Sequence, residues 1–195
     1  MPPRIKFTKN EIVAAALNLV KREGINGLTA RGLGVELGTS SRPIFTAFQN
    51  MEEVRREVFQ AAKSVYHTYS MKGLAENPPF RGAGMQYFRF AKEEPKLFEL
   101  LFMKGNGTTN SISDILLLTH DNHEKMIATI QQSYDVSKDN AITIFQTMFL
   151  FTHGLACLHV SGRMHFSENE VRERIIDVFK GVLLKIKSES LESGI

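Results

Sequence analysis

The first hydrophobic pattern in the chain has the spacing of one helix face. Its apolar positions, at i, i+3, i+4, i+7 and i+8, are Ile12, Ala15, Ala16, Leu19 and Val20. Thr8 and Glu11 have the spacing of a capping box, in which each side chain accepts a hydrogen bond from the other residue's backbone N–H. Gly24 can adopt the left-handed conformation that ends a helix. The pattern therefore predicts a helix that begins after Thr8 and ends before Gly24.

Two shorter helices, separated by a tight turn, are predicted next. Thr29 can cap the first helix, and Gly38 permits the turn. The second helix can begin at one of the hydroxyl residues 39–41, with Pro43 in its first turn, where the missing N–H costs nothing. The apolar positions of the pair are Leu33, Leu37, Ile44, Phe45 and Phe48. This is a helix-turn-helix pattern, in which the second helix can present its N-terminal residues to DNA bases; an ordinary αα-hairpin is the alternative.

The rest of the chain has helical periodicity and no strand pattern of useful length. A long helix over 51–75 can be capped by Asn50 and ends at Asn77-Pro78-Pro79, because a residue before proline disfavours helix. Further helices are predicted over 82–93, 95–103, 110–134, 138–161 and 167–188, the last opening with a second capping box at 167–170. We predict an all-α protein: a three-helix head, residues 1–50, joined by a long helix to a helical domain, residues 51–195.

Composition narrows the class of protein. The chain has 195 residues, of which 43% are hydrophobic and 23% charged, so it can bury a globular core. Its single cysteine, Cys157, excludes an intrachain disulfide and a cysteine-based zinc cluster, which favours the cytoplasm. The N-terminus has no apolar run typical of a secretory signal. Polar residues interrupt the apolar stretch 145–160, so we expect a buried helix there and no membrane partner.

Positive charge is concentrated near the N-terminus. Residues 1–63 carry ten basic and six acidic side chains, whereas the whole chain has a net charge of only +3. A basic head on a nearly neutral body is typical of a modest nucleic-acid footprint. A solvated surface that binds nothing would have the same composition.

Residues 8–55 combine these features in one order and spacing. The matching positions are Ile12 to Leu17, Gly24, Leu28-Thr29, Leu33 to Gly38, Ser40, Ile44-Phe45, Phe48 and the polar run 49–54. This arrangement resembles the head of the TetR family of bacterial transcriptional repressors. Two positions depart from the family: Phe45 stands where tyrosine is usual, and Met51 where lysine is usual. Both usual residues generally contact DNA phosphates.

The resemblance implies a set of DNA contacts. The residues are Arg4, Lys6, Thr29, Ser40, Ser41, Arg42, Pro43, Phe45 and Thr46. Those between 41 and 46 would face the major groove, with Phe45 near the DNA backbone. Arg42 is the best candidate for a base contact, because bidentate arginine to guanine is the commonest specific pairing. Thr29 and Ser40 are equally suited to capping, while Arg4 and Lys6 would enter the minor groove or touch phosphate. The expected partner is a palindromic double-stranded operator, bound by a homodimer.

The C-terminal half resembles, more loosely, a TetR subgroup marked by a Trp-His-Gly motif, with Thr152 at the tryptophan position. Its helices are rich in Phe and Met and could line an apolar pocket for an unidentified small-molecule effector. The predicted ligand-binding residues are Phe88, Phe102, Met148, Phe149 and His153. Helices 138–161 and 167–188 resemble the family's dimer face, with Ile142, Phe149, Leu155, Val171, Ile175 and Val182 as interface candidates.

Motifs for catalysis or metal binding are weak. His120 and His123, beside Asp121, have a spacing that could chelate a metal, and His153, His159 and His165 form a looser set. The sequence contains no Glu-x-x-His pair, Gly-rich phosphate loop or nucleophile elbow. We predict no cofactor, no metal site and no enzyme activity.

The favoured function is therefore a repressor that a small apolar molecule releases from DNA. A helical carrier protein with a degenerate DNA-binding head is the alternative, raised by Phe45 and Met51. A helical-bundle metalloenzyme is the third hypothesis.

Overall fold

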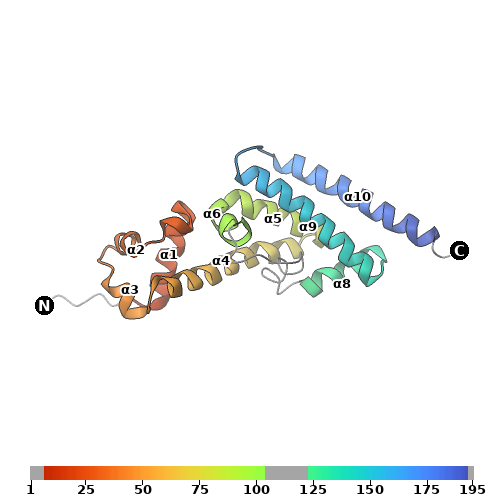
Figure 1. Cartoon of the computed structure of the whole chain (residues 1–195). Coiled ribbons are helices and arrows are strands. Elements are labelled where there is room, and N and C mark those ends of the chain that lie inside the picture. Colours follow the sequence, from red (N-terminus) through yellow and green to blue (C-terminus); the bar gives the residue numbers. More distant parts are fainter. Residues whose placement is uncertain (1–6, 104–122, 193–195) are drawn as a thin grey trace. The chain divides into compact units, whose positions relative to one another are not determined.

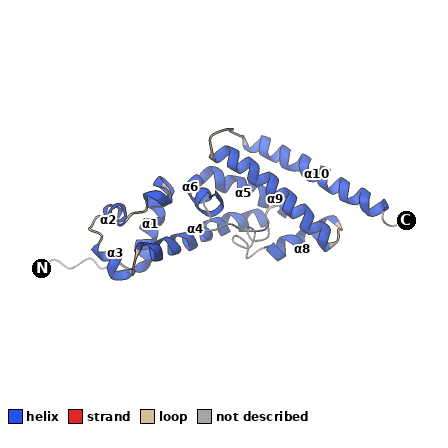
Figure 2. Ribbon diagram, in the orientation of Figure 1, coloured by secondary structure: helices blue, strands red, loops and turns tan. Residues whose placement is uncertain are grey.

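The computed structural model describes residues 7–103 and 123–192, and all regular structure in these ranges is helical (Figures 1 and 2). The helices are α1 (Lys9–Glu23), η1 (Ile25–Gly27), α2 (Ala30–Glu36), α3 (Arg42–Ala47), α4 (Met51–Leu74), α5 (Pro79–Glu93), α6 (Pro95–Phe98), η2 (Glu99–Met103), α8 (His123–Tyr134), α9 (Lys138–Val160) and α10 (Glu168–Glu192). The predicted all-α fold is confirmed. Arg4 and Lys6, and most of the predicted helix over 110–134, lie outside the described residues.

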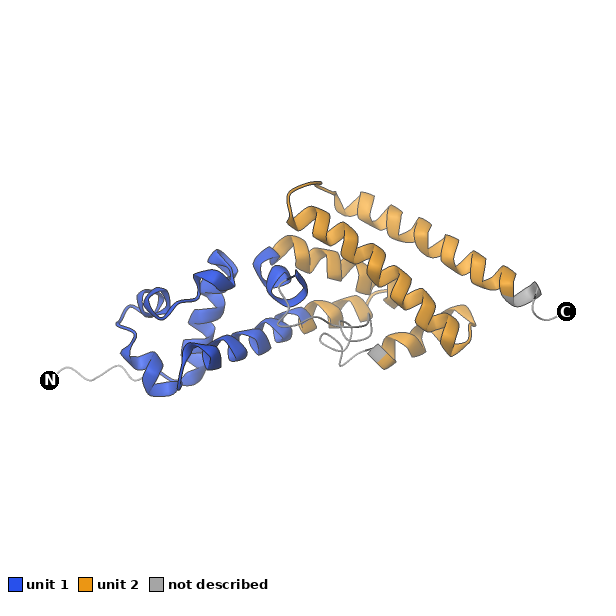
Figure 3. Cartoon of the chain, in the orientation of Figure 1, with its two compact units in different colours: residues 1–66, 94–107 blue, residues 67–93, 108–195 orange. Residues whose placement is uncertain are grey.

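The chain forms two compact units (Figure 3). Unit 1 comprises Met1–Tyr66 and Glu94–Gly107, and unit 2 comprises His67–Glu93 and Thr108–Ile195. Helix α4 therefore contributes residues to both units, and a segment from the middle of the chain belongs to the N-terminal unit. The two units describe how the chain packs and do not test the predicted functional division into residues 1–50 and 51–195, which stays a prediction.

Side-chain caps set the helix starts in unit 1. The Thr8 hydroxyl accepts from the Glu11 N–H at 3.2 Å, and the Glu11 carboxylate accepts from the Thr8 N–H at 2.7 Å. The Thr29 hydroxyl accepts from the Gly32 N–H at 3.0 Å, and the Asn50 side chain accepts from the Glu53 N–H at 2.9 Å. The predicted caps at 8, 29 and 50 are confirmed.

The core of unit 1 combines the N-terminal helices with α6. Its buried side chains include Ile12, Leu19, Val20, Leu28, Leu33, Ile44, Val54 and Val58 together with Leu97 and Phe98. Helix α6 packs against α1, and the Lys21 ammonium lies 2.5 Å from the Glu94 carboxylate just before α6. The segment that follows α6, η2, is a π-helix, where periodicity predicted one continuous helix over 95–103.

Helix α9 is the central helix of unit 2, packing against α5, α8 and α10 (Figure 1). Its buried residues include Ile144, Phe145, Met148, Thr152 and Leu155. By length and composition α9 could also cross a membrane: its most apolar window has a mean hydropathy of 1.5, with 39% of the window buried. The core helix of a soluble protein passes the same test. The predicted second capping box is confirmed by Ser167 and Glu170, at the start of α10.

Two glycines allow the end of α4 to approach the start of α5 closely. A Cβ on Gly73 would lie 2.6 Å from the Ala83 Cα, and a Cβ on Gly82 would lie 2.6 Å from the Glu76 Cβ. No side chain other than hydrogen fits at either position without backbone movement. This contact fixes the position of Phe80 and Arg81, in the first turn of α5, against the rest of unit 2.

Candidate DNA-binding face and ligand pocket

The turn between α2 and α3 is tight because two glycines permit it. The Thr39 N–H donates to the Gly34 carbonyl at 2.8 Å, and a Cβ on Gly34 would lie 3.0 Å from the Thr39 carbonyl oxygen. Gly38 has a φ of 65°, in the left-handed region that a Cβ disfavours. The turn thus seats α3 directly against α2, as a helix-turn-helix requires.

Helix α3 presents a polar face to solvent. Ile44 is its one buried residue, whereas Arg42, Phe45 and Thr46 are exposed, and their i, i+3, i+4 spacing places them on one face. The Phe45 side chain is 50% exposed, so its ring adds apolar surface to this otherwise polar face. The structure therefore brings three of the predicted DNA contacts together.

The other predicted contacts flank this face. Thr29, exposed, caps α2, and Pro43 lies half-buried in the first turn of α3. Ser41 occupies the N-cap position of α3 without a side-chain hydrogen bond to the helix. The Ser40 hydroxyl instead accepts from the Arg42 N–H at 3.4 Å.

Most of the positive charge on α1 and α4 is already paired. Lys9 contacts Glu53 at 3.0 Å and Arg22 contacts Glu36 at 2.7 Å, and Arg55 pairs with Glu52 while donating to the Leu28 carbonyl. The pKa of Glu53 is lowered mainly by the hydrogen bond from the Gln49 N–H and next by the hydrogen bond from Lys9. The hydrogen bond from Arg22 lowers the pKa of Glu36. These carboxylates remain charged at neutral pH, so they neutralise their partners.

A second group of cations forms no ion pair in the described parts of the chain. Its members are Arg31, Arg42, Arg56 and Lys63. Arg31 and Arg42 are exposed on α2 and α3. Sequence reasoning missed Arg31, although its place in the first turn of the helix that Thr29 caps was a usable signal. Within the described residues, these two arginines are the exposed cations of α2 and α3 that form no ion pair.

The predicted ligand-binding residues separate into three places. Phe149 and His153 stack with ring centroids 5.7 Å apart, and the His153 Nδ1 lies 2.9 Å from the Tyr87 hydroxyl. Met148 is buried nearby on α9, and Phe88 is buried against the rings of His159 and Phe166. Phe102 belongs to unit 1. Tyr87 is a member of the first cluster that sequence reasoning missed.

His153 is held neutral by its surroundings. Burial lowers its pKa, and its Nε2 lies 3.3 Å from the Cys157 sulfur. Burial also raises the pKa of Cys157, so the thiol stays protonated at neutral pH. The pair forms a polar element inside an apolar helix and offers no charged nucleophile.

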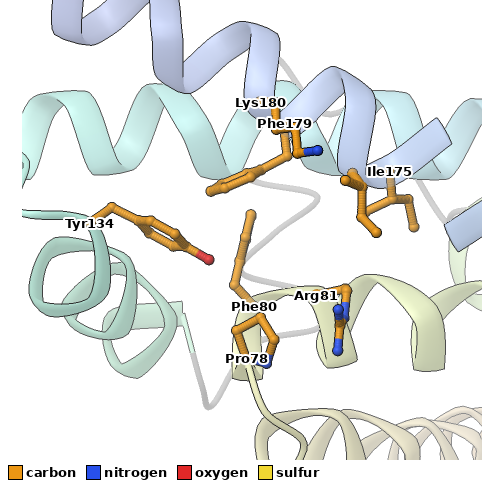
Figure 4. Close-up of a pocket in the computed structure, with 8 residues that line it drawn as sticks. Pro78, Phe80, Arg81, Tyr134, Ile175, Phe179 and Lys180 are labelled. Carbon is orange, nitrogen blue, oxygen red and sulfur yellow. The ribbon is translucent and has the colours of Figure 1, made fainter. Parts of the chain in front are cut away.

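A pocket of about 240 Å³ lies elsewhere in unit 2 (Figure 4). Its lining residues are Pro78, Phe80, Arg81, Tyr134, Ile175, Ile176, Phe179 and Lys180. They come from the start of α5, the end of α8 and the middle of α10 (Figure 4). None of the predicted ligand-binding residues lines it, so their role stays a prediction.

Comparison with known proteins places the chain in a family. A family model described as "Tetracyclin repressor-like, C-terminal domain" matches residues 80–179, about half of the chain. The chain belongs to the TetR family. The match lies in the C-terminal half, so the head of this TetR-family protein is assigned by its own residues and geometry. A comparison with curated protein sequences finds no match.

A solved structure shares the fold of nearly the whole chain. It is titled "Structure of a protein with unknown function from Rhodococcus sp. RHA1" and superposes with a TM-score of 0.67 at 19% sequence identity. The superposition covers 95% of this chain and 99% of that chain. At this identity the likeness concerns the fold alone.

Of the six dimer candidates of this TetR-family chain, three are buried within unit 2 and three are half-buried. Leu155, Val171 and Ile175 are each less than 10% exposed, and Ile142, Phe149 and Val182 are half-buried. An exposed apolar stripe runs instead along α9 through Leu150, Gly154 and Leu158, and Leu184 is 72% exposed on α10. Sequence periodicity missed this stripe because α9 is apolar on all sides.

Metal ligands do not gather in the described residues. Residues 7–103 and 123–192 contain no group of three or more His, Cys, Asp or Glu side chains that could hold an ion. His120 and Asp121 lie outside the described part, and the side chain of His123 is not described.

Proposed function

We propose that this TetR-family protein is a homodimeric, DNA-binding transcriptional regulator that a small molecule releases from its operator. The observation that carries the proposal is the exposed face of α3, on which Arg42 and Thr46 meet solvent while Ile44 anchors the helix. The Thr46 hydroxyl donates to the Arg42 carbonyl at 3.1 Å, so its oxygen is left to accept a hydrogen bond. The protein acts as a repressor in the cytoplasm and is not an enzyme.

DNA recognition would use two kinds of contact. Arg42, near the N-terminus of α3, has the planar fork of donors that pairs with the O6 and N7 of guanine. Arg31 and Thr29 of α2 would bind phosphates and so position the helix without reading sequence. Phe45, with no hydroxyl, would pack against a sugar or a thymine methyl group.

Dimerisation would use the exposed stripe of α9 with Leu184 of α10. Two large leucines on α9 and one on α10 leave apolar surface in water, and a symmetric partner offers the same surface in return. A palindromic operator needs two heads whose recognition helices are about 34 Å apart. The dimer therefore raises the affinity for the operator above that of a single head and sets the distance between the two recognition helices.

Release would follow from a change in that spacing. Helix α4 contributes residues to both units, so a ligand that selects a different arrangement in unit 2 would also bias the head through this helix. The two recognition helices of the dimer would then no longer match successive turns of the major groove.

The deciding experiment is a selection of genomic fragments by the purified protein at near-physiological salt, followed by sequencing. A short palindrome is the expected result. Arg42→Ala should then weaken binding to that palindrome about 10- to 100-fold and relax specificity at one base pair. Arg172→Ala, which removes an exposed arginine from α10, is the matched control and should leave affinity unchanged. Equal losses in both variants would refute the assignment of α3.

The second candidate is a helical carrier protein with a degenerate head. Phe45 and Met51 favour it, because each lacks a group that generally contacts phosphate in the family, and Arg55 cannot substitute while it binds Glu52 and the Leu28 carbonyl. Retention on duplex DNA at increasing salt separates the two. A regulator loses affinity with a log-log slope of about −0.9 per phosphate contact, and a carrier shows no retention at any salt.

A further inference from the structure

We propose that the pocket between α5, α8 and α10 binds a small amphipathic carboxylate, with one aromatic ring or a short alkyl chain. Its lining combines an apolar wall with the cationic side chains Arg81 and Lys180, and none of the lining residues within the described ranges is acidic. That its ligand is the effector of this regulator rests on the function proposed above; binding itself does not.

The size of the pocket sets the size of the ligand. A dry apolar cavity of about 150 Å³ holds one benzene molecule, so a pocket of about 240 Å³ holds a ring with a chain of two or three atoms. Larger drug-sized ligands need pockets of roughly 300 Å³ or more. The ligand is therefore a small molecule with a single ring or its aliphatic equivalent.

The wall is aromatic on two sides. The ring centroid of Phe179 lies 5.7 Å from that of Phe80 and 4.7 Å from that of Tyr134. Figure 4 shows these rings turned toward one another, with the Tyr134 hydroxyl directed toward Phe80 and Ile175 beside them. Such tilted rings offer both faces and edges to an inserted ring.

The two cations make the electrostatic potential of the pocket positive. Lys180 is exposed and has no ion pair within residues 7–103 and 123–192. Arg81 donates one of its five N–H groups to the Asn77 carbonyl at 2.9 Å, which leaves the others for a ligand. Burial raises the pKa of Tyr134 and the charge of Arg81 opposes this rise, so the field of Arg81 reaches the aromatic wall.

Charge and apolar surface together select the ligand class. A cation would be repelled, and a neutral hydrocarbon would leave both positive charges without a partner. An inorganic anion would leave the three rings unused. A carboxylate on a short apolar stem satisfies both parts, because arginine and lysine bind carboxylates through charge-assisted hydrogen bonds.

The test measures binding by titration calorimetry with 3-phenylpropionate and its uncharged isostere 3-phenylpropanamide. The acid should bind at least about tenfold more tightly than the amide, since only the acid gains charge-assisted bonds. The double variant Arg81→Gln with Lys180→Gln should bring the acid down to the affinity of the amide. Lys187→Gln, which removes an exposed cation outside the pocket on the same helix, is the matched control and should change neither.

A second variant tests the cavity without touching its charge. Ile176→Trp fills the apolar space, so it should abolish binding of both compounds while the protein retains its cooperative melting transition. Three outcomes would each refute the proposal. The acid and the amide bind with equal affinity, the double variant binds the acid as tightly as the unmodified protein does, or the variant with the filled pocket still binds fully.

Operator binding, measured separately, keeps the two proposals apart. A protein that binds its palindrome but neither compound refutes this site and leaves the regulator intact. A protein that binds the acid but no DNA supports this site and refutes the regulator.

Discussion

Both units join helices through ion pairs, in unit 2 between Arg89 of α5 and Glu168 of α10 at 2.6 Å, but they differ in where they place their other polar side chains. Unit 1 joins its helices through ion pairs at the surface, such as Lys9 with Glu53 and Arg22 with Glu36. Unit 2 places polar groups among apolar ones: His153 lies between Tyr87 and Cys157, and the buried Gln86 donates to Glu76 at 2.9 Å. In unit 1 the candidate DNA-binding face carries the cations that form no ion pair. In unit 2 the pocket is lined by residues from three helices.

The largest expected effect concerns the exposed apolar residues of each unit. Replacing Leu150 and Leu158 of α9 together by Glu should weaken the dimer by about 100-fold or more, because two charges per subunit would be buried at the interface. Sedimentation velocity should show monomers at micromolar concentration, and operator affinity should fall in parallel.

Met103→Glu is the control for this variant. Met103 is an exposed apolar residue of unit 1, 44% accessible, and its replacement should leave the dimer intact. A dimer that survives the double replacement would assign the α9 stripe another partner.

The next effect compares close contacts made by glycines. Gly73→Ala forces a Cβ against the backbone of α5 and should lower the free energy of unfolding by about 2 kcal/mol. Gly34→Ala, whose Cβ would lie 3.0 Å from the turn, should cost less but reduce operator binding. Urea denaturation and DNA titration separate the two outcomes.

Gly181→Ala provides the matched control on α10. No atom lies within 4 Å of a Cβ at this position, so the substitution should stabilise the helix by roughly 0.5–1 kcal/mol. If all three substitutions had the same effect on unfolding, the close approaches would not constrain the fold.

A smaller effect restores the two positions at which the head departs from its family. Met51→Lys adds a cation at the start of α4 and should steepen the salt dependence of DNA binding by about 0.9 in log-log slope. Phe45→Tyr should raise affinity several-fold at constant slope, because a hydroxyl adds a hydrogen bond without charge. Gln132→Lys adds the same charge to an exposed position on α8 of unit 2, away from the proposed dimer surface, and should leave the slope unchanged.

The smallest expected effect is a difference in stability between the two units as the pH falls: unit 2 should lose stability at a higher pH than unit 1. Burial holds the pKa of His153 below its ordinary value of about 6.5, so its contribution to stability is present above that pH and is lost as the pH falls. Unit 1 has no histidine, and the lowered pKa values of Glu36 and Glu53 protect its stability down to about pH 4.3.

Hydrogen exchange at pH 7 and pH 5.5, corrected for the intrinsic rates, should show the amides of unit 2 losing protection first. His153→Asn should remove part of this difference. Earlier loss of protection in α1 and α2 would contradict the assignment.

Local signals predicted the fold well because each acts over a few residues. The caps at Thr8, Thr29 and Ser167 and the left-handed Gly24 stand where the sequence placed them. The candidate DNA-binding face rests on the same kind of signal together with the family resemblance, and it stays a prediction.

The pocket could not be predicted in this way. Phe80, Tyr134 and Lys180 are dozens of residues apart, and only the packing of three helices brings them together. Periodicity also gave no means to divide the apolar side chains of α9 between the core and the surface. Leu155 is therefore buried where the dimer face was expected, and Leu150 is exposed where it was not.

The segment Glu94–Met103 has a consequence for how such regulators can be recombined. It completes the core of unit 1 with Leu97 and Phe98, although the chain before Glu94 and after Gly107 belongs to unit 2. A fragment ending at residue 50 or 66 would lack this part of its core. The head therefore cannot be transferred to another protein as one continuous segment of chain. A chimera that transplants DNA specificity from one relative to another must exchange two separate stretches of chain, or retain a native α6 that fits the incoming α1.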